Sequence, residues 1–350
     1  MDLAEMPGRL EALLRANGEP EDVRVTDVTP IVGGYSLVMA SFTATSSSGD
    51  SRTLVLRADP PADAALTITD RSREWELLTS LTARGDVPMP AARMADLTGS
   101  HLGRPGIVLD FVDGTQLGTH LSSVDPAAYP DLSAALAESI ASVHAVGEAA
   151  VPASFERPGS WDAYVDGLIA RWRAIEAAHA ERDPFIRWVA GWLDANRPPP
   201  APLTLVHGEF QAGNVMLNAT GGLDIVDWEF AHVGDPRADL GWFQQVAAFS
   251  PPDLIGADPV AFCERYCKAS GLSSEVVNPL TIGYFSILGA AGAIGSLLQG
   301  IAAMANGENH LITSAYLTSA VAFTHRLWRE GVLGLEAAMA AVTAQMEAAP

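Results

Sequence analysis

The chain has 350 residues, 48% of them hydrophobic, which is enough to bury a large core and exceeds one typical domain. Its net charge of −21 disfavours nucleic acid and anionic membranes as partners, because both are negatively charged. The acidic start lacks a signal-peptide core, and Cys263 and Cys267 lie one helical turn apart, so we expect a reduced, cytoplasmic protein without a zinc site.

The N-terminal part predicts strands joined by turns. Apolar runs at 23–25, 37–39 and 53–57 are separated by a polar turn at 46–51 and by a glycine turn. The glycine turn contains Gly33, Gly34, Tyr35 and Ser36. Backbone N–H groups of such a turn can approach a phosphate, although a lone Gly-Gly pair is most often an ordinary hairpin turn.

Two charged residues follow this turn at informative positions. Arg57 ends the third apolar run, and a helix is predicted over 69–83 with Asp70 as N-cap and Glu74 in its first turns. A basic residue on a third strand can pair with an acid on the next helix and point at nucleotide phosphates. Two solvated surface charges are the alternative. The single lysine, Lys268, lies far from this strand, so any phosphate-binding cation there must be Arg57.

A change in pattern near residue 112 predicts two domains. Residues 107–112 predict a last strand of the N-terminal part. We therefore predict an N-terminal domain at 1–112 and a mostly helical domain at 113–350. Windows with helical spacing of apolar residues follow at 131–146, 161–180 and 184–195, and a final helix is predicted at 335–349.

One segment of the second domain has the length of a membrane span. Residues 287–305 are largely apolar, but polar residues interrupt them and basic anchors do not flank them. We expect a buried helix there and no membrane contact.

The central part of the chain predicts a small sheet. Apolar runs at 203–206, 215–217 and 223–226 predict three strands, and a turn with Asn and Gly at 218–222 joins the last two. We expect the polar residues at the ends of these runs to lie together at one edge of this sheet.

Those polar residues are of the kinds that kinases use. Glu209 and Asn214 follow the first run, and Asp227 ends the third. In kinases, a loop carboxylate orients the attacking hydroxyl, while an Asn and an Asp hold magnesium on the nucleotide phosphates. A surface hairpin with solvated polar side chains is the alternative.

The stretch His207-Gly208-Glu209, Asn214 and Ile225-Val226-Asp227-Trp228 resembles the signature of the aminoglycoside phosphotransferase and choline kinase superfamily. That signature reads His-Gly-Asp, four residues, Asn, and later Ile-Asp-Trp/Phe. The chain is most similar to the kinase-like domain fused to some long acyl-CoA dehydrogenases, where an Arg commonly stands at the phosphate-binding strand. The resemblance implies an α+β, two-lobed protein-kinase-like fold, with ATP or GTP and Mg²⁺ as cofactors.

The resemblance also implies roles for individual residues. Glu209 would be the catalytic acid/base, Asn214 and Asp227 the catalytic magnesium ligands, and Asp239 and His207 the supports of the catalytic loop. In that fold, 1–112 would be the nucleotide-binding domain and 113–350 the catalytic and substrate-binding domain. The nucleotide would contact Gly33, Gly34, Tyr35, Ser36, Arg57 and Glu74, and the backbone of a hinge at Asp110 and Val112 would bind an adenine edge. Glu209 departs from the usual Asp, and its extra methylene moves the carboxylate by about 1 Å, which can cost about 100-fold in rate.

The acceptor remains open at this point. The resemblance implies a small-molecule hydroxyl, and an aminoglycoside or other antibiotic, a hydroxylated metabolite and a hydroxyacyl-CoA all fit. A catalytically weak nucleotide- or metabolite-binding module is the competing hypothesis, since Arg57 and Glu209 both depart from the wider family. Retention of both magnesium ligands argues against that alternative. The sequence predicts no oligomeric state.

Overall fold

The computed structural model describes residues 5–31, 38–47, 49–60, 70–179, 184–305 and 311–348. The predicted turn with Gly33, Gly34, Tyr35 and Ser36 lies outside these residues. The chain forms two compact units. We call residues 1–120, 149–155 and 213–231 the first unit, and residues 121–148, 156–212 and 232–350 the second unit. The predicted division at residue 112 remains a prediction, although these contacts group 213–231 with the N-terminal residues.

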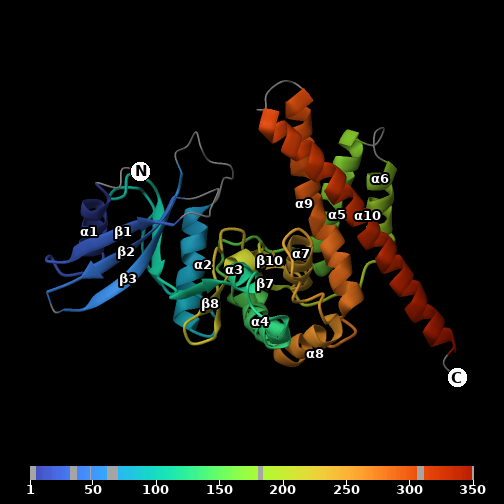
Figure 1. The fold of residues 1–350 in the computed structure, drawn as a ribbon, viewed down its shortest axis with the longest axis horizontal. Helices are drawn as coiled ribbons and strands as arrows, with labels where there is room; N and C mark the ends of the chain where they lie inside the picture. Colours follow the sequence, from blue (N-terminus) through green and yellow to red (C-terminus); the bar gives the residue numbers. More distant parts are fainter. Residues whose placement is uncertain are drawn as a thin grey trace. The chain divides into compact units, whose positions relative to one another are not determined.

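A five-stranded antiparallel sheet dominates the first unit (Figure 1). Its strand order is β1-β2-β3-β5-β4. The strands are β1 (Arg24–Pro30), β2 (Val38–Thr45), β3 (Ser51–Ala58), β4 (Ala92–Asp96) and β5 (Gly106–Asp110). The apolar runs predicted as strands correspond to β1, β2, β3 and β5, whereas β4 was not predicted. The α+β class expected from the sequence is confirmed.

Alternation along β3 decides where Arg57 points. Leu56 of β3 packs with Phe42 of β2 and with Leu10 of α1 (Met6–Ala16) in one buried cluster, so α1 covers that face of the sheet. Successive side chains of a strand point to opposite faces. Arg57, the next residue, therefore projects from the other face.

Helix α2 (Arg71–Arg84) presents a buried face to that other side of the sheet. Its N-cap is Asp70, as predicted: one carboxylate oxygen accepts the N–H groups of Ser72 and Arg73 at 3.1 and 3.0 Å. Gly85 ends the helix with a φ of 72°, a left-handed conformation that glycine adopts without a steric penalty. Buried residues on one stripe of this helix are Glu74, Leu77, Leu78 and Leu81.

A three-stranded sheet of order β6-β8-β9 completes the first unit. Its strands are β6 (Gly114–Gln116), β8 (Val215–Asn218) and β9 (Leu223–Ile225). The side-chain oxygen of Asn218 accepts the N–H groups of Thr220 and Gly222 at 3.1 and 2.9 Å, which closes the predicted turn between β8 and β9. The turn chemistry therefore fixes the register of this hairpin.

The prediction that the apolar run at 203–206 joins this sheet is wrong. That run forms β7 (Thr204–Val206), which pairs with β10 (His232–Gly234) in a separate two-stranded sheet of the second unit. The reason is that β6 occupies the outer edge of β8, and β10 supplies β7 with antiparallel backbone partners.

Helices make up most of the second unit. The helices predicted at 131–146, 161–180 and 184–195 are present with ends within two residues. In full, they are α4 (Tyr129–His144), α5 (Trp161–His179), α6 (Pro184–Ala195), α7 (Arg237–Ala247), α8 (Pro259–Ser270), α9 (Pro279–Ala305) and α10 (Leu311–Ala348). Short helices elsewhere in the chain are α3 (Leu117–Leu121), η1 (Pro126–Ala128), η2 (Glu148–Ala150) and η3 (Ala212–Asn214).

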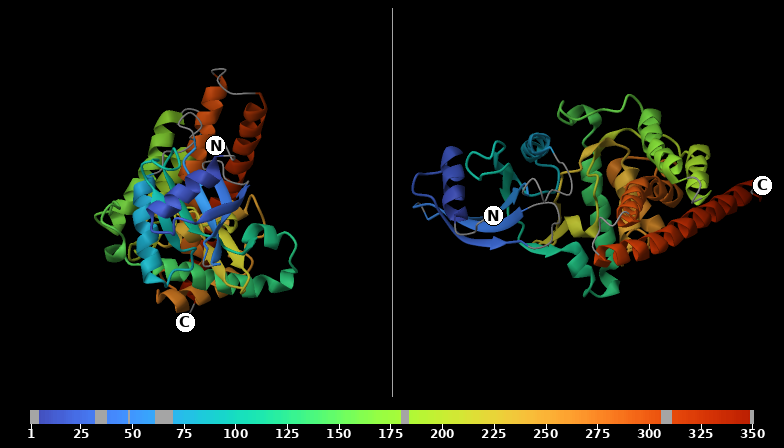
Figure 2. Two further views of the ribbon diagram at one scale, coloured as in Figure 1. Left: turned by 90° about the vertical axis from the view of Figure 1, so that its left-hand side faces the viewer. Right: turned by 90° about the horizontal axis from the view of Figure 1, so that it is seen from above.

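Helices α9 and α10 run side by side, and α10 continues beyond α9 toward the C-terminus (Figures 1 and 2). The expected buried helix is part of α9, where Ile287, Leu288 and Ile294 are buried. Among the residues described, no helix is both long enough and apolar enough to span a bilayer. The final helix was predicted to begin at residue 335, but it begins at Leu311 and continues through Gly331 and Gly334.

Candidate active site

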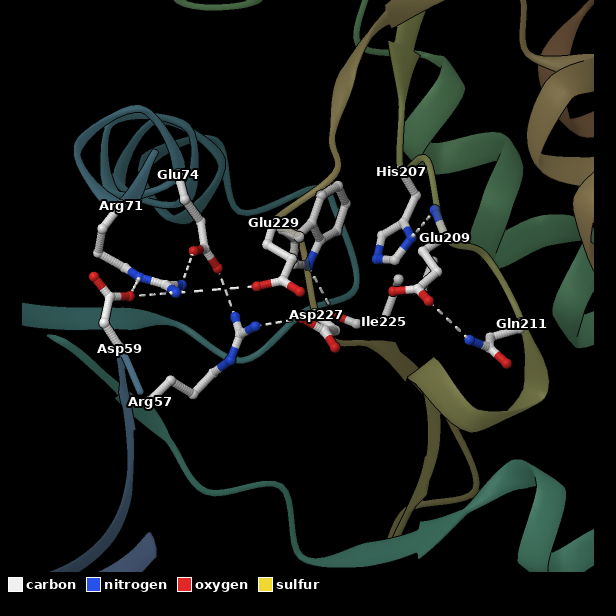
Figure 3. A network of polar contacts seen from close by, with 11 residues as sticks. Arg57, Asp59, Arg71, Glu74, His207, Glu209, Gln211, Ile225, Asp227 and Glu229 are labelled. Atoms are coloured by element: carbon white, nitrogen blue, oxygen red, sulfur yellow. Dashed lines mark hydrogen bonds and ion pairs between the residues drawn. The ribbon is translucent and has the colours of Figure 1, made fainter. Parts of the chain in front are cut away.

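The predicted pair of Arg57 and Glu74 is present in the first unit (Figure 3). Arg57 Nη1 donates to Glu74 Oε1 at 2.5 Å, and the two residues are each 3% exposed. A buried charge is tolerated only when it is paired and hydrogen-bonded, so this contact fixes the direction of the Arg57 side chain.

Glu74 has a second cationic partner that the sequence analysis missed. Its Oε2 accepts from Arg71 Nη1, three residues earlier in α2. The same guanidinium donates to Asp59 Oδ1 through Nε at 3.1 Å and Nη2 at 2.8 Å. Asp59 directly follows β3, so the network ties the start of α2 to the end of the strand that carries Arg57. The i, i+3 spacing of Arg71 and Glu74 was the signal that could have revealed this pair.

Arg57 also contacts Asp227, the predicted magnesium ligand, through a hydrogen bond from Nη2 to Oδ1 (Figure 3). Asp227 lies two residues after β9 and has a φ of 71°, a left-handed conformation that Asp tolerates better than most residues. Val226 N–H donates to the carbonyl oxygen of Asn214 at 2.9 Å. Asn214 and Asp227 therefore lie at the same end of the β8-β9 hairpin, as predicted for this part of the motif.

A further acid in this cluster, Glu229, was not predicted as a site residue. It is 7% exposed, and its Oε2 has no hydrogen-bond partner among the described residues, with Arg71 Nη2 at 4.0 Å. Burial and the nearby charge of Asp227 raise the pKa of Glu229 to about 7, although Arg57 opposes this shift.

The charge of Arg57 is strongly stabilised. Burial by itself lowers the pKa of Arg57, but the carboxylates of Glu74, Asp227 and Glu229 outweigh burial and leave its pKa above the ordinary value. The guanidinium is thus a permanent cation beside the predicted metal ligands, which is where nucleotide phosphates require positive charge.

In the second unit, Asp239 holds the loop that follows β7. Its carboxylate accepts the backbone N–H groups of His207 at 2.7 Å and Gly208 at 2.9 Å. This is the loop-anchoring arrangement that the resemblance implied. His144 Nε2 lies 3.1 Å from Asp239 Oδ2, and its Nδ1 lies 2.8 Å from the Tyr266 hydroxyl. His144 was not predicted, because it lies 95 residues before Asp239.

Asp239 is ionised despite complete burial. Burial alone raises the pKa of its carboxyl, but the hydrogen bond and charge of His144, together with the charge and backbone N–H of His207, bring it below the ordinary value. A carboxylate that accepts several hydrogen bonds keeps its charge.

Glu209, the predicted acid/base residue, lies on this anchored loop and is partly exposed. Its backbone N–H donates to His207 Nδ1 at 3.3 Å, so the His207 ring braces the loop as expected (Figure 3). Gln211 Nε2 donates to Glu209 Oε1 at 3.3 Å. The Glu209 carboxylate is thus partly exposed, and Gln211 of the same loop helps to orient it.

Of the two predicted hinge residues, Asp110 is the last residue of β5 and Val112 lies outside the strand. Asp110 is paired through its side chain with Arg93, with a 2.6 Å bond from Nε to Oδ1, and its N–H donates to the Ala91 carbonyl oxygen at 3.0 Å. Val112 follows β5 outside the ladder. Contact of Asp110 and Val112 with an adenine edge stays a prediction.

Asn214, Asp227 and Arg57 have the chemistry that a magnesium–nucleotide complex requires. The Asp227 carboxylate and the Asn214 amide offer hard oxygen donors at one end of a hairpin, and Mg²⁺ prefers such ligands. Arg57 adds a fixed cation for phosphate oxygens. The residues fit a magnesium–nucleotide complex.

Residues 27–273 match the model of the phosphotransferase enzyme family. The chain belongs to this family. It is therefore a phosphotransferase with an alcohol group as acceptor, and the resemblance read from its motifs is confirmed.

Two acyl-CoA dehydrogenase relatives align with the chain over only part of their own length. Acyl-CoA dehydrogenase family member 11 of Gallus gallus is 27% identical over 259 residues, which cover 67% of this chain and 33% of that protein. Acyl-CoA dehydrogenase family member 10 of Mus musculus is 25% identical over 195 residues, covering 55% and 18%. The chain thus spans a third or less of the length of these relatives.

A crystal structure shows the same fold over nearly the whole phosphotransferase. A candidate aminoglycoside phosphotransferase from Ralstonia eutropha JMP134 superposes with a TM-score of 0.70 at 20% identity, covering 93% of this chain and 97% of that one. This likeness confirms the predicted protein-kinase-like fold.

Proposed function

We propose that this phosphotransferase transfers the γ-phosphoryl group of ATP, bound with Mg²⁺, to the hydroxyl of a small molecule. The observation that carries the proposal is the contact of Arg57 with both Glu74 and Asp227. This contact joins the residues proposed as the phosphate-binding cation, its supporting acid and a magnesium ligand, which come from β3, α2 and the segment after β9. GTP is the alternative donor.

The chain's own residues divide the work as follows. Arg57, held by Glu74, would neutralise phosphate oxygens with a guanidinium that remains charged at every working pH. Asn214 and Asp227 would hold the magnesium ion, which supplies charge neutralisation on the phosphates when bound. Gly33, Gly34, Tyr35 and Ser36 would contact the phosphates, and Asp110 and Val112 the adenine.

Glu209 would orient the acceptor hydroxyl and receive its proton. Support comes from the loop itself, since Asp239 holds the two preceding backbone N–H groups and His207 holds that of Glu209. Glu209 also lies only five positions before Asn214, the spacing found in kinase catalytic loops. Because phosphoryl transfer depends mainly on positioning, a rigid loop serves the reaction more than a strong base does.

The proposed acceptor is a small hydroxylated molecule of one of two classes. An aminoglycoside or other antibiotic fits the name of the Ralstonia eutropha neighbour, whereas a hydroxyacyl-CoA fits the acyl-CoA dehydrogenase relatives. The net charge of −21 favours a cationic or neutral acceptor over an anionic one.

A thermal-shift titration with ATP and with GTP, each with Mg²⁺, tests nucleotide binding, because a ligand that binds only the folded state raises the midpoint of unfolding. An ATP-consumption screen over hydroxylated metabolites and antibiotics then finds the acceptor. Asp227→Asn should abolish transfer, while Asp86→Asn, a matched change of an exposed acid in the same unit, should not. No shift with millimolar nucleotide would contradict the proposal, whereas binding without transfer for any acceptor would favour the binding module.

A further inference from the structure

Arg71 occupies an unfavourable position for a cation. It is the first residue of α2, where the helix dipole favours negative charge, and it is 4% exposed. Burial adds to this cost, because it removes the hydration of the guanidinium. A buried cation at the N-terminus of a helix depends on specific partners, and those partners indicate what the side chain does.

The first partner of Arg71 is fixed to the sheet of the first unit. Asp59, which follows β3, accepts from Arg71 Nε at 3.1 Å and from Nη2 at 2.8 Å. The backbone of Asp59 is itself held: its N–H donates to the Pro105 carbonyl oxygen at 2.9 Å, and its carbonyl oxygen accepts from Arg104 Nη1 at 3.0 Å. Asp59 therefore anchors one edge of the Arg71 guanidinium.

The second partner of Arg71 is Glu74, whose two oxygens bind different arginines (Figure 3). Arg71 Nη1 donates to Glu74 Oε2, while Arg57 Nη1 donates to Glu74 Oε1 at 2.5 Å. A carboxylate beside a single arginine frequently binds it with both oxygens and two N–H groups. Because Arg71 takes one oxygen of Glu74, Arg57 is held through Nη1, and its Nη2 reaches Asp227 instead.

We propose that Arg71 is a positioning residue for phosphate binding. By occupying Glu74 Oε2, it prevents Glu74 from binding two N–H groups of Arg57, so Arg57 Nη2 stays directed toward Asp227 and the phosphates of a bound nucleotide. Arg71 acts through Glu74 and Arg57 and does not itself contact the nucleotide. This inference rests on the proposed function, which makes the phosphates the ligand of Arg57.

The first measurement needs no nucleotide. The guanidinium Nη signals of Arg57 in ¹⁵N spectra of the full chain, assigned with Arg57→Lys, report its hydrogen bonds. We expect them to shift in Arg71→Met, where Glu74 can bind Arg57 with both oxygens, and to stay in place in Arg84→Met. Arg84 is the matched control, because it ends the same helix and forms a partly exposed pair with Asp86. Unmoved Arg57 signals in Arg71→Met would overturn the proposal.

The second measurement separates phosphate binding from a general loss of structure. ATP with Mg²⁺ and adenosine are titrated by calorimetry, since adenosine keeps the base and the ribose but lacks the phosphates. Arg71→Met should weaken ATP binding about tenfold, the effect of one hydrogen bond to a charged group, and leave adenosine binding within about twofold of the parent. Arg84→Met should change neither affinity.

Arg71→Lys keeps the test decisive where Arg71→Met does not fold. Lysine retains the buried positive charge, but a point charge cannot bind Asp59 and Glu74 with two separate edges. This variant should shift the Arg57 signals and weaken ATP binding by about threefold or more, with adenosine binding unchanged. Equal weakening of ATP and adenosine would show a general loss of structure and overturn the proposal. A parent that binds neither ATP nor GTP would refute the proposed function, and the Arg57 signals would then decide alone whether Arg71 positions that side chain.

Discussion

Arg57 and Asp227, 170 residues apart in the sequence, are joined by a direct hydrogen bond between guanidinium and carboxylate. The same guanidinium binds Glu74, so one side chain connects β3, α2 and the segment after β9. The predicted phosphate-binding cation and a predicted metal ligand thus restrain each other. We therefore expect both the stability of the fold and catalysis to depend on Arg57.

Replacing Arg57 with Met should lower the free energy of unfolding by about 3–5 kcal/mol, because buried carboxylates lose their counter-charge. Arg52→Met on the same strand is the control. Its pair with Glu19 is partly exposed, with 42% and 27% of the side chains accessible, so the loss should stay below about 1 kcal/mol. Urea unfolding measures both, and similar losses for the two variants would contradict the role of burial.

Asp239→Asn should destabilise the protein by roughly 3 kcal/mol near neutral pH, since an amide cannot replace a carboxylate that accepts from His207, Gly208 and His144. The lowered pKa of Asp239 means that its ionised form stabilises the folded state above about pH 4, the range of an unfolded carboxyl. That contribution disappears as the pH falls through the lower folded-state pKa.

The difference in free energy of unfolding between the parent and Asp239→Asn should therefore shrink toward pH 3. Denaturant unfolding at several pH values measures it. Asp162→Asn, at an exposed first-turn acid of α5, serves as the matched control and should show a small effect throughout. A deficit for Asp239→Asn that is independent of pH would argue against an ionised loop anchor.

Glu229→Gln should stabilise the folded state at high pH. A carboxyl whose pKa is raised to about 7 binds its proton more tightly when folded, so its ionisation costs stability as the pH rises from about 4 to 7. The cost is at most about 3 kcal/mol above pH 7 and is absent below pH 4. Unfolding at pH 8 and pH 4 measures the difference, with exposed Glu264→Gln as control. An equal effect of Glu229→Gln at pH 8 and pH 4 would show that the pKa of Glu229 is not raised.

Substitutions of Glu209 distinguish an enzyme from a binding module. Glu209→Gln should lower turnover strongly while ATP affinity changes little. Glu209→Asp should lower turnover about 10- to 100-fold, because a loop held by Asp239 and His207 is adapted to the longer side chain. Single-turnover kinetics and nucleotide titration measure these effects.

A faster Glu209→Asp variant would show that Glu is a tolerated defect in the loop. Unchanged transfer in both variants would remove Glu209 from the mechanism.

The sequence predicted those parts of the site that local patterns determine. The apolar run at 53–57 placed Arg57 on a strand, the Asp70 cap placed Glu74 on a helix, and the Asn218 turn brought Asn214 and Asp227 to one hairpin end. Each of these positions follows from periodicity or turn chemistry within about 30 residues. Pairing of Arg57 with Glu74 then required only that the helix cover the correct face of the sheet.

The rest depends on contacts between distant segments. His144 reaches Asp239 across 95 residues, and β7 pairs with β10, which is only three residues long and therefore shows no measurable periodicity. Arg71 could have been found by its helical spacing from Glu74, but its bond with Asp59 depends on where β3 ends. Burial raises the pKa of Glu229, and the local sequence pattern does not show that this side chain is buried.

If Arg57 binds the nucleotide phosphates as proposed, this arginine also changes how the protein can be detected. Arg57 remains protonated and is not a nucleophile, whereas Lys268, the chain's single lysine, is exposed on α8. Acyl-phosphate nucleotide reagents label kinases by acylating a lysine amine beside the bound phosphates. We expect covalent profiling with such reagents to pass over this protein. An ordinary amine-reactive dye would mark a single side chain, Lys268 on α8, besides the α-amino group.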